Sequence, residues 1–225
     1  ALDVGFAMYD RDDRLLICNS TFRSFYPAVA PMLVPGAHMD ELLALAGEAE
    51  ATTAGAVHLD NVAPCLLGGV QLIAAGKSHR LPWPTAVALV VASPALQLPT
   101  RTARAALPTA LPLAETIAHA GHAAGLVHAL HANDLGLLSA SLRDVIAEPA
   151  RAALVPGFRQ AQAAALAHGA LGCSLSGAGP AVFAATLVND AEQVARALEQ
   201  GFAAGNVAAT ARICRIDPLG ARVLP

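Results

Sequence analysis

The sequence predicts an α+β fold in which helices cover one face of an antiparallel sheet. Thr85–Ser93 is apolar and has the length of a buried strand, and Pro112–His131 is an alanine-rich stretch with the length of a long helix. Residues 169–184 alternate on either side of a glycine turn, as a β-hairpin does. From Thr85 the predicted order is strand, helices, strand, hairpin strand, helix, strand. This split βαβ order is typical of a ferredoxin-like sandwich.

Composition limits the function classes. The 225 residues are 55% hydrophobic and 14% charged, which predicts a sizeable core in one large domain or two small ones. The net charge of -3 argues against a general nucleic-acid surface. No apolar run reaches the roughly 18 residues of a membrane span. Charged residues at Asp10–Arg14 interrupt the region where a signal peptide would lie.

The four cysteines are far apart and lack the spacing of metal ligands. Cys18, Cys65, Cys173 and Cys214 each lie in an apolar stretch. We therefore expect buried, reduced thiols in a cytoplasmic protein.

Residues 1–40 differ from the rest because they hold most of the aromatic side chains. Val4–Tyr9 and Arg14–Cys18 are predicted strands around an acidic turn, followed by a short helix that ends near Tyr26. The stretch GFAMYDRDDRLLICNSTFRSFYP resembles the opening of a PAS domain. Residues 1–40 are thus interpreted as a PAS-like fragment, a small N-terminal α/β segment that makes the chain resemble a fusion.

The remaining elements follow from periodicity and from glycine and proline positions. A helix is predicted from Glu41, a strand at Val70–Ala74, and a corner at residues 82–84. Short helical segments are predicted at Thr100–Leu107, Asn133–Leu138 and Ser141–Ile146, with a break at Glu148-Pro149. Longer helices are predicted at Pro156–His168 and Ala191–Ala204, followed by a strand at Val207–Ile216. Asn189 or Asp190 is expected to cap the helix at Ala191–Ala204, and Gly205 to end it.

The turn at Ser176–Pro180 has two interpretations. Gly177 and Gly179 permit backbone angles that a β-carbon would disfavour, which suits a plain hairpin turn. Consecutive N–H groups in such a turn can also form a concave anion site.

Other polar residues likewise allow a structural or a functional interpretation. His58 and Asp60 belong either to a capped loop or to a small-molecule site. Glu50 lies on a solvated helix face or contributes to a Mg²⁺ site. Arg104 and Arg151 are surface cations or forks for a carboxylate.

Four strings together resemble the carboxyl-terminal part of homoserine kinases, in the GHMP kinase superfamily. They are AEATTAGAVHLDNVAPCLLGG, TRTARAALP, LRDVIAEPARAALVPGF and GALGCSLSGAGPAVFA, and the resemblance runs from about Leu42 to Val223. It implies that residues 41–84 are a remnant of the family's N-terminal domain and that residues 85–225 are its ferredoxin-like C-terminal domain.

The resemblance also implies roles for single residues. Glu50 matches an acidic residue that helps to hold Mg²⁺ and serves catalysis. His58 and Asp60 match residues that line the amino-acid site, with Asp60 also counted as catalytic. Thr100 and Arg104 match residues that face the substrate.

The resemblance further implies which residues bind the substrate carboxylate and the phosphates of the cofactor. Arg151 matches a catalytic arginine that helps to bind the homoserine carboxylate. The loop that closes over substrate and cofactor contains Ser176, Gly177 and Gly179. The implied reaction is γ-phosphoryl transfer from ATP, with Mg²⁺, to the hydroxyl of L-homoserine, a step of threonine biosynthesis. From charge and apolar patterning we expect no nucleic-acid or membrane partner, and a homodimer is one possible assembly.

One family feature is missing from these residues. The glycine- and serine-rich phosphate loop P-x-x-x-G-L-G-S-S does not occur, and no G-x-x-x-x-G-K-[ST] string replaces it. Such a loop supplies backbone donors at a helix N-terminus that hold ATP. The alternatives to an active kinase are therefore a non-catalytic amino-acid-binding protein or a PAS-fused sensor or interaction protein.

The missing string predicts weak nucleotide binding. We expect the Kd for ATP–Mg²⁺ to exceed about 1 mM, as measured by titration calorimetry on the purified chain. Micromolar affinity would contradict this prediction, because it would require phosphate contacts that the string does not provide.

Overall fold

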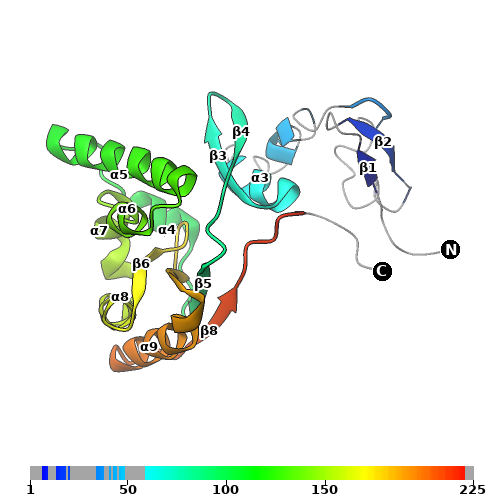
Figure 1. The fold of residues 1–225 in the computed structure, drawn as a ribbon. Coiled ribbons are helices and arrows are strands. Elements are labelled where there is room, and N and C mark those ends of the chain that lie inside the picture. The colour runs from blue at the N-terminus through cyan, green and yellow to red at the C-terminus, as the bar shows by residue number, and fades with distance from the viewer. Residues whose placement is uncertain are drawn as a thin grey trace. The chain divides into compact units, whose positions relative to one another are not determined.

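The computed structural model describes residues 59–220 and, before them, residues 7–9, 14–18, 20, 34–37, 41, 43–44 and 46–48. It contains two compact units (Figure 1). The N-terminal unit consists of Ala1–Leu81 together with Asp217–Pro225, and the C-terminal unit is Pro82–Ile216. Among the described residues, no helix combines the length and the hydropathy that a membrane span requires.

The N-terminal unit contains two small antiparallel hairpins. Strands β1 (Ala7–Tyr9) and β2 (Leu15–Cys18) pair as the sequence predicts, while their turn and most of the predicted helix after them lie outside the described residues. Strand β3 (Val70–Ala74) was also predicted.

Helix α3 (Leu59–Leu67) and strand β4 (Lys77–Leu81) depart from the sequence-based expectations. The stretch that could have been a capped loop is the start of α3. Strand β4 was not predicted because its residues are polar. It returns along β3 because Ala75 and Gly76 both adopt positive φ, the geometry of a tight two-residue hairpin turn.

The C-terminal unit is built on one four-stranded antiparallel sheet, as predicted. Its strands are β5 (Val87–Pro94), β6 (Ala170–Leu175), β7 (Val182–Leu187) and β8 (Ala209–Cys214). Their spatial order is β6-β7-β5-β8. With helices between β5 and β6 and one helix between β7 and β8, this is the predicted ferredoxin-like arrangement.

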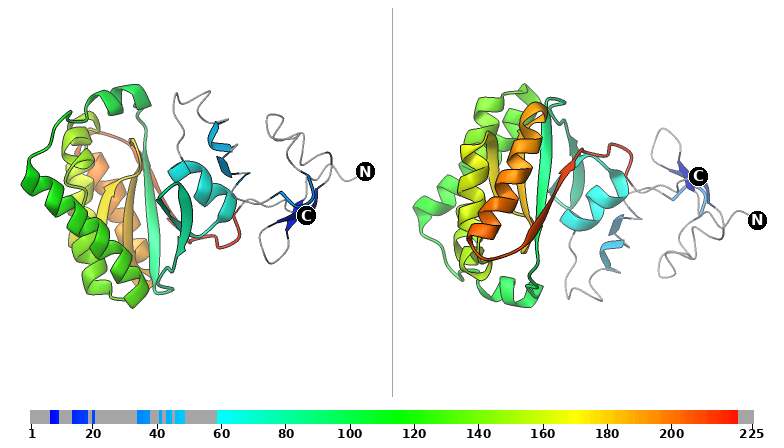
Figure 2. Two further views of the ribbon diagram at one scale, coloured as in Figure 1. Left: turned by 90° about the horizontal axis from the view of Figure 1, so that it is seen from above. Right: turned by 90° about the horizontal axis from the view of Figure 1, so that it is seen from below.

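Helices α8 and α9 cover one face of this sheet (Figure 2). The helices of the unit are α4 (Thr100–Ala105), α5 (Leu113–Ala132), α6 (Leu135–Ser141), α7 (Ala147–Arg151), α8 (Phe158–Ala167) and α9 (Ala191–Ala204), with short 3₁₀ turns η2 (Ala152–Leu154) and η3 (Val188–Asp190).

The core lies between the sheet and α8 and α9. Alternate residues of β5, Ala88, Val90 and Ala92, are buried in it. Phe158 of α8 and Phe202 of α9 are the largest fully buried side chains among the described residues. Small strand residues opposite large helix residues allow the two layers to pack closely.

Two predictions between α6 and α8 are wrong. Ser141–Ile146 is not helical beyond the end of α6, because Asp144 turns its carboxylate onto the backbone amides that follow. Its Oδ1 accepts from the amides of Ile146 and Ala147, and its Oδ2 accepts from the amide of Glu148. The pair Glu148-Pro149 does not interrupt a helix but lies within α7. Proline is tolerated there because an amide in the first turn of a helix has no intrahelical acceptor.

The bounds of α9 agree with the prediction, but its predicted cap does not form. Asp190 occupies the N-cap position without a side-chain capping bond, and its carboxylate accepts from Gln193 instead. Helices α8 and α9 approach closely because Gly201 lacks a side chain. A β-carbon at Gly201 would overlap the backbone of Ala161.

We predict that Gly201→Ala destabilises the C-terminal unit by about 1–3 kcal/mol, because neither backbone can yield without separating the two helices. Urea unfolding followed by the fluorescence of Trp83, the single tryptophan, measures this change. Gly121→Ala is the matched control, since nothing lies near a β-carbon at this position of α5, and it should stabilise by up to about 1 kcal/mol. Equal unfolding midpoints for the two variants would contradict the close helix contact.

Candidate functional site

The structure places the predicted site residues in both units. Asp60 lies in the first turn of α3, in the N-terminal unit. Glu50 and His58 lie outside the described residues. The other predicted residues lie in the C-terminal unit, on α4, on α7 and in the glycine turn. The convergence of Asp60 with the arginines thus stays a prediction.

Helix α4 presents Thr100 and Arg104 on one face. The two residues are a full turn apart, and both are exposed, whereas Ala103 between them is buried. Whether both side chains face a ligand stays a prediction, because most other residues of α4 are exposed as well.

The glycine turn joins β6 to β7 and contains two internal hydrogen bonds. The Ser176 amide donates to the Ala181 carbonyl at 2.8 Å, and the Gly179 amide donates to the Ser176 carbonyl at 3.0 Å. Gly177 and Gly179 have φ of 58° and 80°, which explains glycine at both positions. Among the described residues, the amides of Gly177 and Ala178 make no hydrogen bond, so two adjacent N–H groups are available to an anion.

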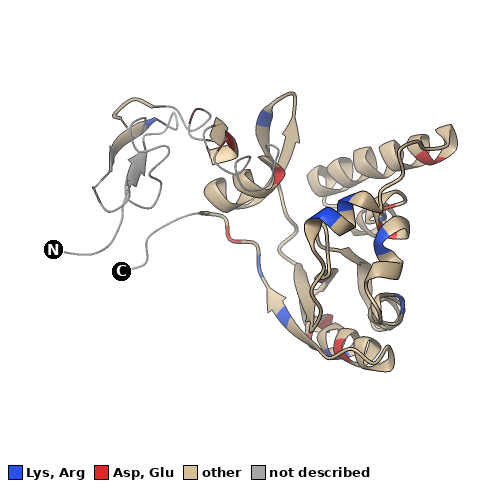
Figure 3. Ribbon diagram, turned by 180° about the vertical axis from the view of Figure 1, so that it is seen from behind, with Lys and Arg blue, Asp and Glu red and all other residues tan. Residues whose placement is uncertain are grey.

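Arg151, at the end of α7, connects α4 to the glycine turn. Its Nε donates to the Ala103 carbonyl at 3.0 Å, and its NH1 donates to the Gly177 carbonyl at 3.1 Å. The blue parts of α4 and α7, which mark their arginines, accordingly lie near one another (Figure 3). Ala103 lies near the end of α4, where helix carbonyls lack intrahelical donors. The NH2 group of Arg151 has no hydrogen-bond partner in the described part of the chain and is available to a ligand.

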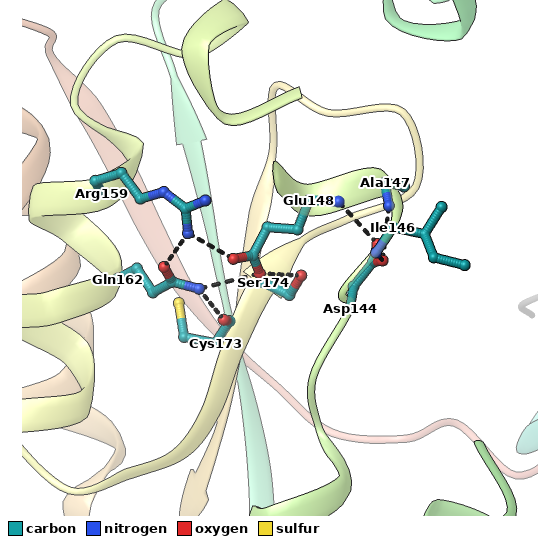
Figure 4. Close-up of polar contacts among 8 residues, drawn as sticks. All are labelled: Asp144, Ile146, Ala147, Glu148, Arg159, Gln162, Cys173 and Ser174. Atoms are coloured by element: carbon teal, nitrogen blue, oxygen red, sulfur yellow. Dashed lines mark hydrogen bonds and ion pairs between the residues drawn. The ribbon is translucent and has the colours of Figure 1, made fainter. Parts of the chain in front are cut away.

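A second polar cluster surrounds Glu148, which is only 8% exposed (Figure 4). Its Oε1 accepts from Arg159 NH1 at 2.6 Å, and its Oε2 accepts from Gln162 Nε2 at 3.0 Å and from Ser174 Oγ at 2.7 Å. A buried carboxylate is tolerated only when donors of this kind satisfy it.

Sequence reasoning missed this cluster. Its members come from α7, α8 and β6, and a linear sequence does not indicate which of these elements meet. The available signal was the spacing of Arg159 and Gln162, which share one face of α8.

Gln162 of this cluster and Ser139 of α6 also cover part of the edge strand of the sheet, β6. Gln162 Nε2 donates to the Cys173 carbonyl at 2.7 Å, and Ser139 Oγ donates to the Leu171 carbonyl at 2.6 Å. These side chains occupy carbonyls that would otherwise be open to another strand.

Cys173 is an inert thiol. Burial and, to a smaller extent, the nearby charge of Glu148 raise its pKa to about 12. The thiol therefore stays protonated near neutral pH, and Cys173 cannot serve as a nucleophile there. The expectation that all the cysteines are buried is wrong for Cys65, which is exposed, and Cys214 is partly buried. None of these three described cysteines forms a disulfide.

We predict that a thiol reagent at pH 8 modifies Cys65 rapidly and Cys173 only after unfolding, with mass spectrometry identifying the modified residue. Since thiolate is the reactive form, the raised pKa and the burial act in the same direction. Cys65→Ala is the control that removes the fast phase. Folded-state modification of Cys173 at the rate of Cys65 would contradict the burial.

The same pKa predicts a loss of stability in alkali. A folded-state pKa of about 12, against 9.0 for an ordinary cysteine thiol, means that the stabilising effect of the protonated thiol is fully present below pH 9. It is lost as the pH rises from 9 towards 12, where the unfolded thiol ionises and the folded one does not.

Comparison with known proteins identifies the class of the C-terminal unit. Residues 126–204, which extend from α5 to the end of α9, match the family model described as GHMP kinases C terminal. The chain thus contains a GHMP kinase C-terminal domain.

Two solved structures extend this similarity. A homoserine kinase from Cytophaga hutchinsonii is similar at 35% sequence identity and a TM-score of 0.82, over 91% of this chain and 66% of that one. A protein from Listeria monocytogenes, provisionally named a homoserine kinase, is similar in fold at 24% identity and a TM-score of 0.59, over 90% of this chain and 65% of that one. The chain thus spans slightly less than two thirds of either length.

These matches support the resemblance to homoserine kinases. They do not support the interpretation of residues 1–40 as a PAS-like fragment or of the chain as a fusion.

Proposed function

We propose that this chain is homoserine kinase-like: it binds L-homoserine and supports phosphoryl transfer from ATP to the hydroxyl of that amino acid. The observation that carries the proposal is the position of Arg151, which lies against both the glycine turn and the helix that bears Thr100 and Arg104. The similarity at 35% identity to a homoserine kinase supports the same substrate class.

In this proposal the arginines bind the amino-acid carboxylate. A guanidinium group matches a carboxylate geometrically, and such charge-assisted bonds are among the stronger hydrogen bonds in proteins. Arg104 and the NH2 group of Arg151 would supply the donors. Asp60 would accept from the ammonium group of the substrate.

The donor set of the glycine turn also fits a phosphate-bearing cofactor. The adjacent amides of Gly177 and Ala178 are suited to phosphate oxygens, and Ser176 and Gly179 shape the turn that presents them. When bound, ATP supplies the transferable γ-phosphoryl group, and a Mg²⁺ ion near Glu50 would neutralise phosphate charge. Among the described residues, no group of three His, Cys, Asp or Glu side chains could hold a metal ion. Glu50, which lies outside those residues, is proposed as a ligand on the resemblance alone.

A second candidate is a non-catalytic amino-acid-binding protein. It is the alternative that the sequence raised, because the phosphate-loop string P-x-x-x-G-L-G-S-S does not occur in these 225 residues, which match 66% of the similar homoserine kinase. Both candidates require L-homoserine to bind, whereas only the first forms product. A cytoplasmic location and a homodimer remain predictions.

One assay separates the two candidates. The purified chain is incubated with ATP, Mg²⁺ and L-homoserine, and O-phospho-L-homoserine is measured by mass spectrometry. Product formation supports the kinase. Calorimetric binding of L-homoserine without product supports the second candidate, and the absence of both contradicts the proposal.

We predict that Arg104→Ala and Arg151→Ala each weaken L-homoserine binding at least about tenfold, because each removes charge-assisted bonds to the carboxylate. Arg151→Lys should recover only part of the loss, since one ammonium group cannot reach two carbonyls and a ligand together. Titration calorimetry measures these constants. Arg101→Ala, which removes another exposed arginine of α4, should leave binding unchanged, and an equal loss in that variant would argue for a general charge effect.

A further inference from the structure

We propose that Glu148 is a positioning residue for the glycine turn: its buried carboxylate fixes α7 so that Arg151 can hold the Gly177 carbonyl. The inference rests on the proposed function only for its effect on substrate binding. Its structural part concerns the ligand-free chain.

Helix α7 is too short to hold its own position. It spans only Ala147–Arg151, and isolated helices of that length are not stable in water. Side-chain contacts therefore determine where it lies. The Asp144 carboxylate receives the amides at the start of α7, and Glu148 accepts from three side chains.

Those three side chains belong to rigid parts of the unit. Arg159 and Gln162 project from α8, whose residues Phe158 and Ala161 are completely buried in the core. Ser174 is in β6 and is 7% exposed. Glu148 thus anchors α7 to both layers of the sandwich.

The two charged side chains of α7 act on successive parts of the same chain segment. Glu148 holds Ser174, at the end of the strand that leads into the turn. Arg151 holds Gly177 within the turn. A shift of α7 would move both contacts together, so the carboxylate determines whether the guanidinium reaches the turn.

A role in stability alone does not account for this arrangement. The Arg159 side chain is 52% exposed, and an ion pair with so exposed a partner contributes little to stability, because solvent screens the attraction. The geometry points to positioning: one carboxylate joins three elements at the base of the turn that carries the free Gly177 and Ala178 amides.

The test is amide hydrogen exchange, measured by NMR on the full chain without ligand. The amides of Ser176 and Gly179 form the internal bonds of the turn and report its opening. In Glu148→Gln both should exchange at least about tenfold faster, since the carboxylate loses its charge and an acceptor. The matched control is Glu199→Gln, which alters a carboxylate that accepts from the Ala211 amide on β8, and it should leave both rates unchanged.

A double variant separates positioning from general destabilisation. Once Arg151→Ala has released the turn, Glu148→Gln should add little to the exchange rates of Ser176 and Gly179. A role in stability alone would add its full effect in either background. The affinity for L-homoserine should also fall in Glu148→Gln. A chain that does not bind L-homoserine would still show the exchange result, so the positioning role of Glu148 and the proposed function are tested independently.

Unchanged exchange at the turn in Glu148→Gln would overturn the inference, as would additive effects in the double variant. If Glu148→Gln does not fold, Ser174→Ala decides, because it removes only the contact between the strand and the carboxylate. That variant should raise exchange at Ser176 and Gly179, and wild-type rates would overturn the inference.

Discussion

The bridge that Arg151 makes between the Ala103 and Gly177 carbonyls is the constraint on which the candidate site depends. The glycine turn has two internal hydrogen bonds and two residues of high backbone freedom. Contacts from outside the turn must therefore select its conformation. The bridge joins the turn to α4 through groups of the protein alone, so less ordering is left for substrate binding to accomplish.

This bridge changes how Arg151 is understood. The sequence resemblance treats it as a fork for a carboxylate, yet its Nε and one NH1 hydrogen already serve backbone carbonyls. Only its remaining N–H groups can meet a ligand. Arg104, exposed on the neighbouring helix, then complements Arg151. In the proposed function, a substrate carboxylate would contact both Arg104 and the arginine that shapes the turn.

The sequence predicted the sheet and the long helices because their patterns extend over many residues, as in β5 and α9. It failed where one local contact decides the conformation. Strand β4 depends on positive φ at Ala75 and Gly76, and the non-helical chain before α7 depends on the Asp144 carboxylate. Arg104 and Arg151 were predicted as site residues from the family strings, whereas the Glu148 cluster depends on tertiary contacts that neither periodicity nor those strings contain.

Carboxylate recognition beside a held glycine turn is the central claim, and titration calorimetry with a pair of ligands tests it most directly. L-homoserine is compared with L-homoserinol, in which a hydroxymethyl group replaces the carboxylate and the rest of the molecule is unchanged. The account predicts that L-homoserine binds and that homoserinol binds at least about tenfold more weakly, because the charge-assisted bonds to the arginines are lost. Equal affinities for the two ligands would contradict it.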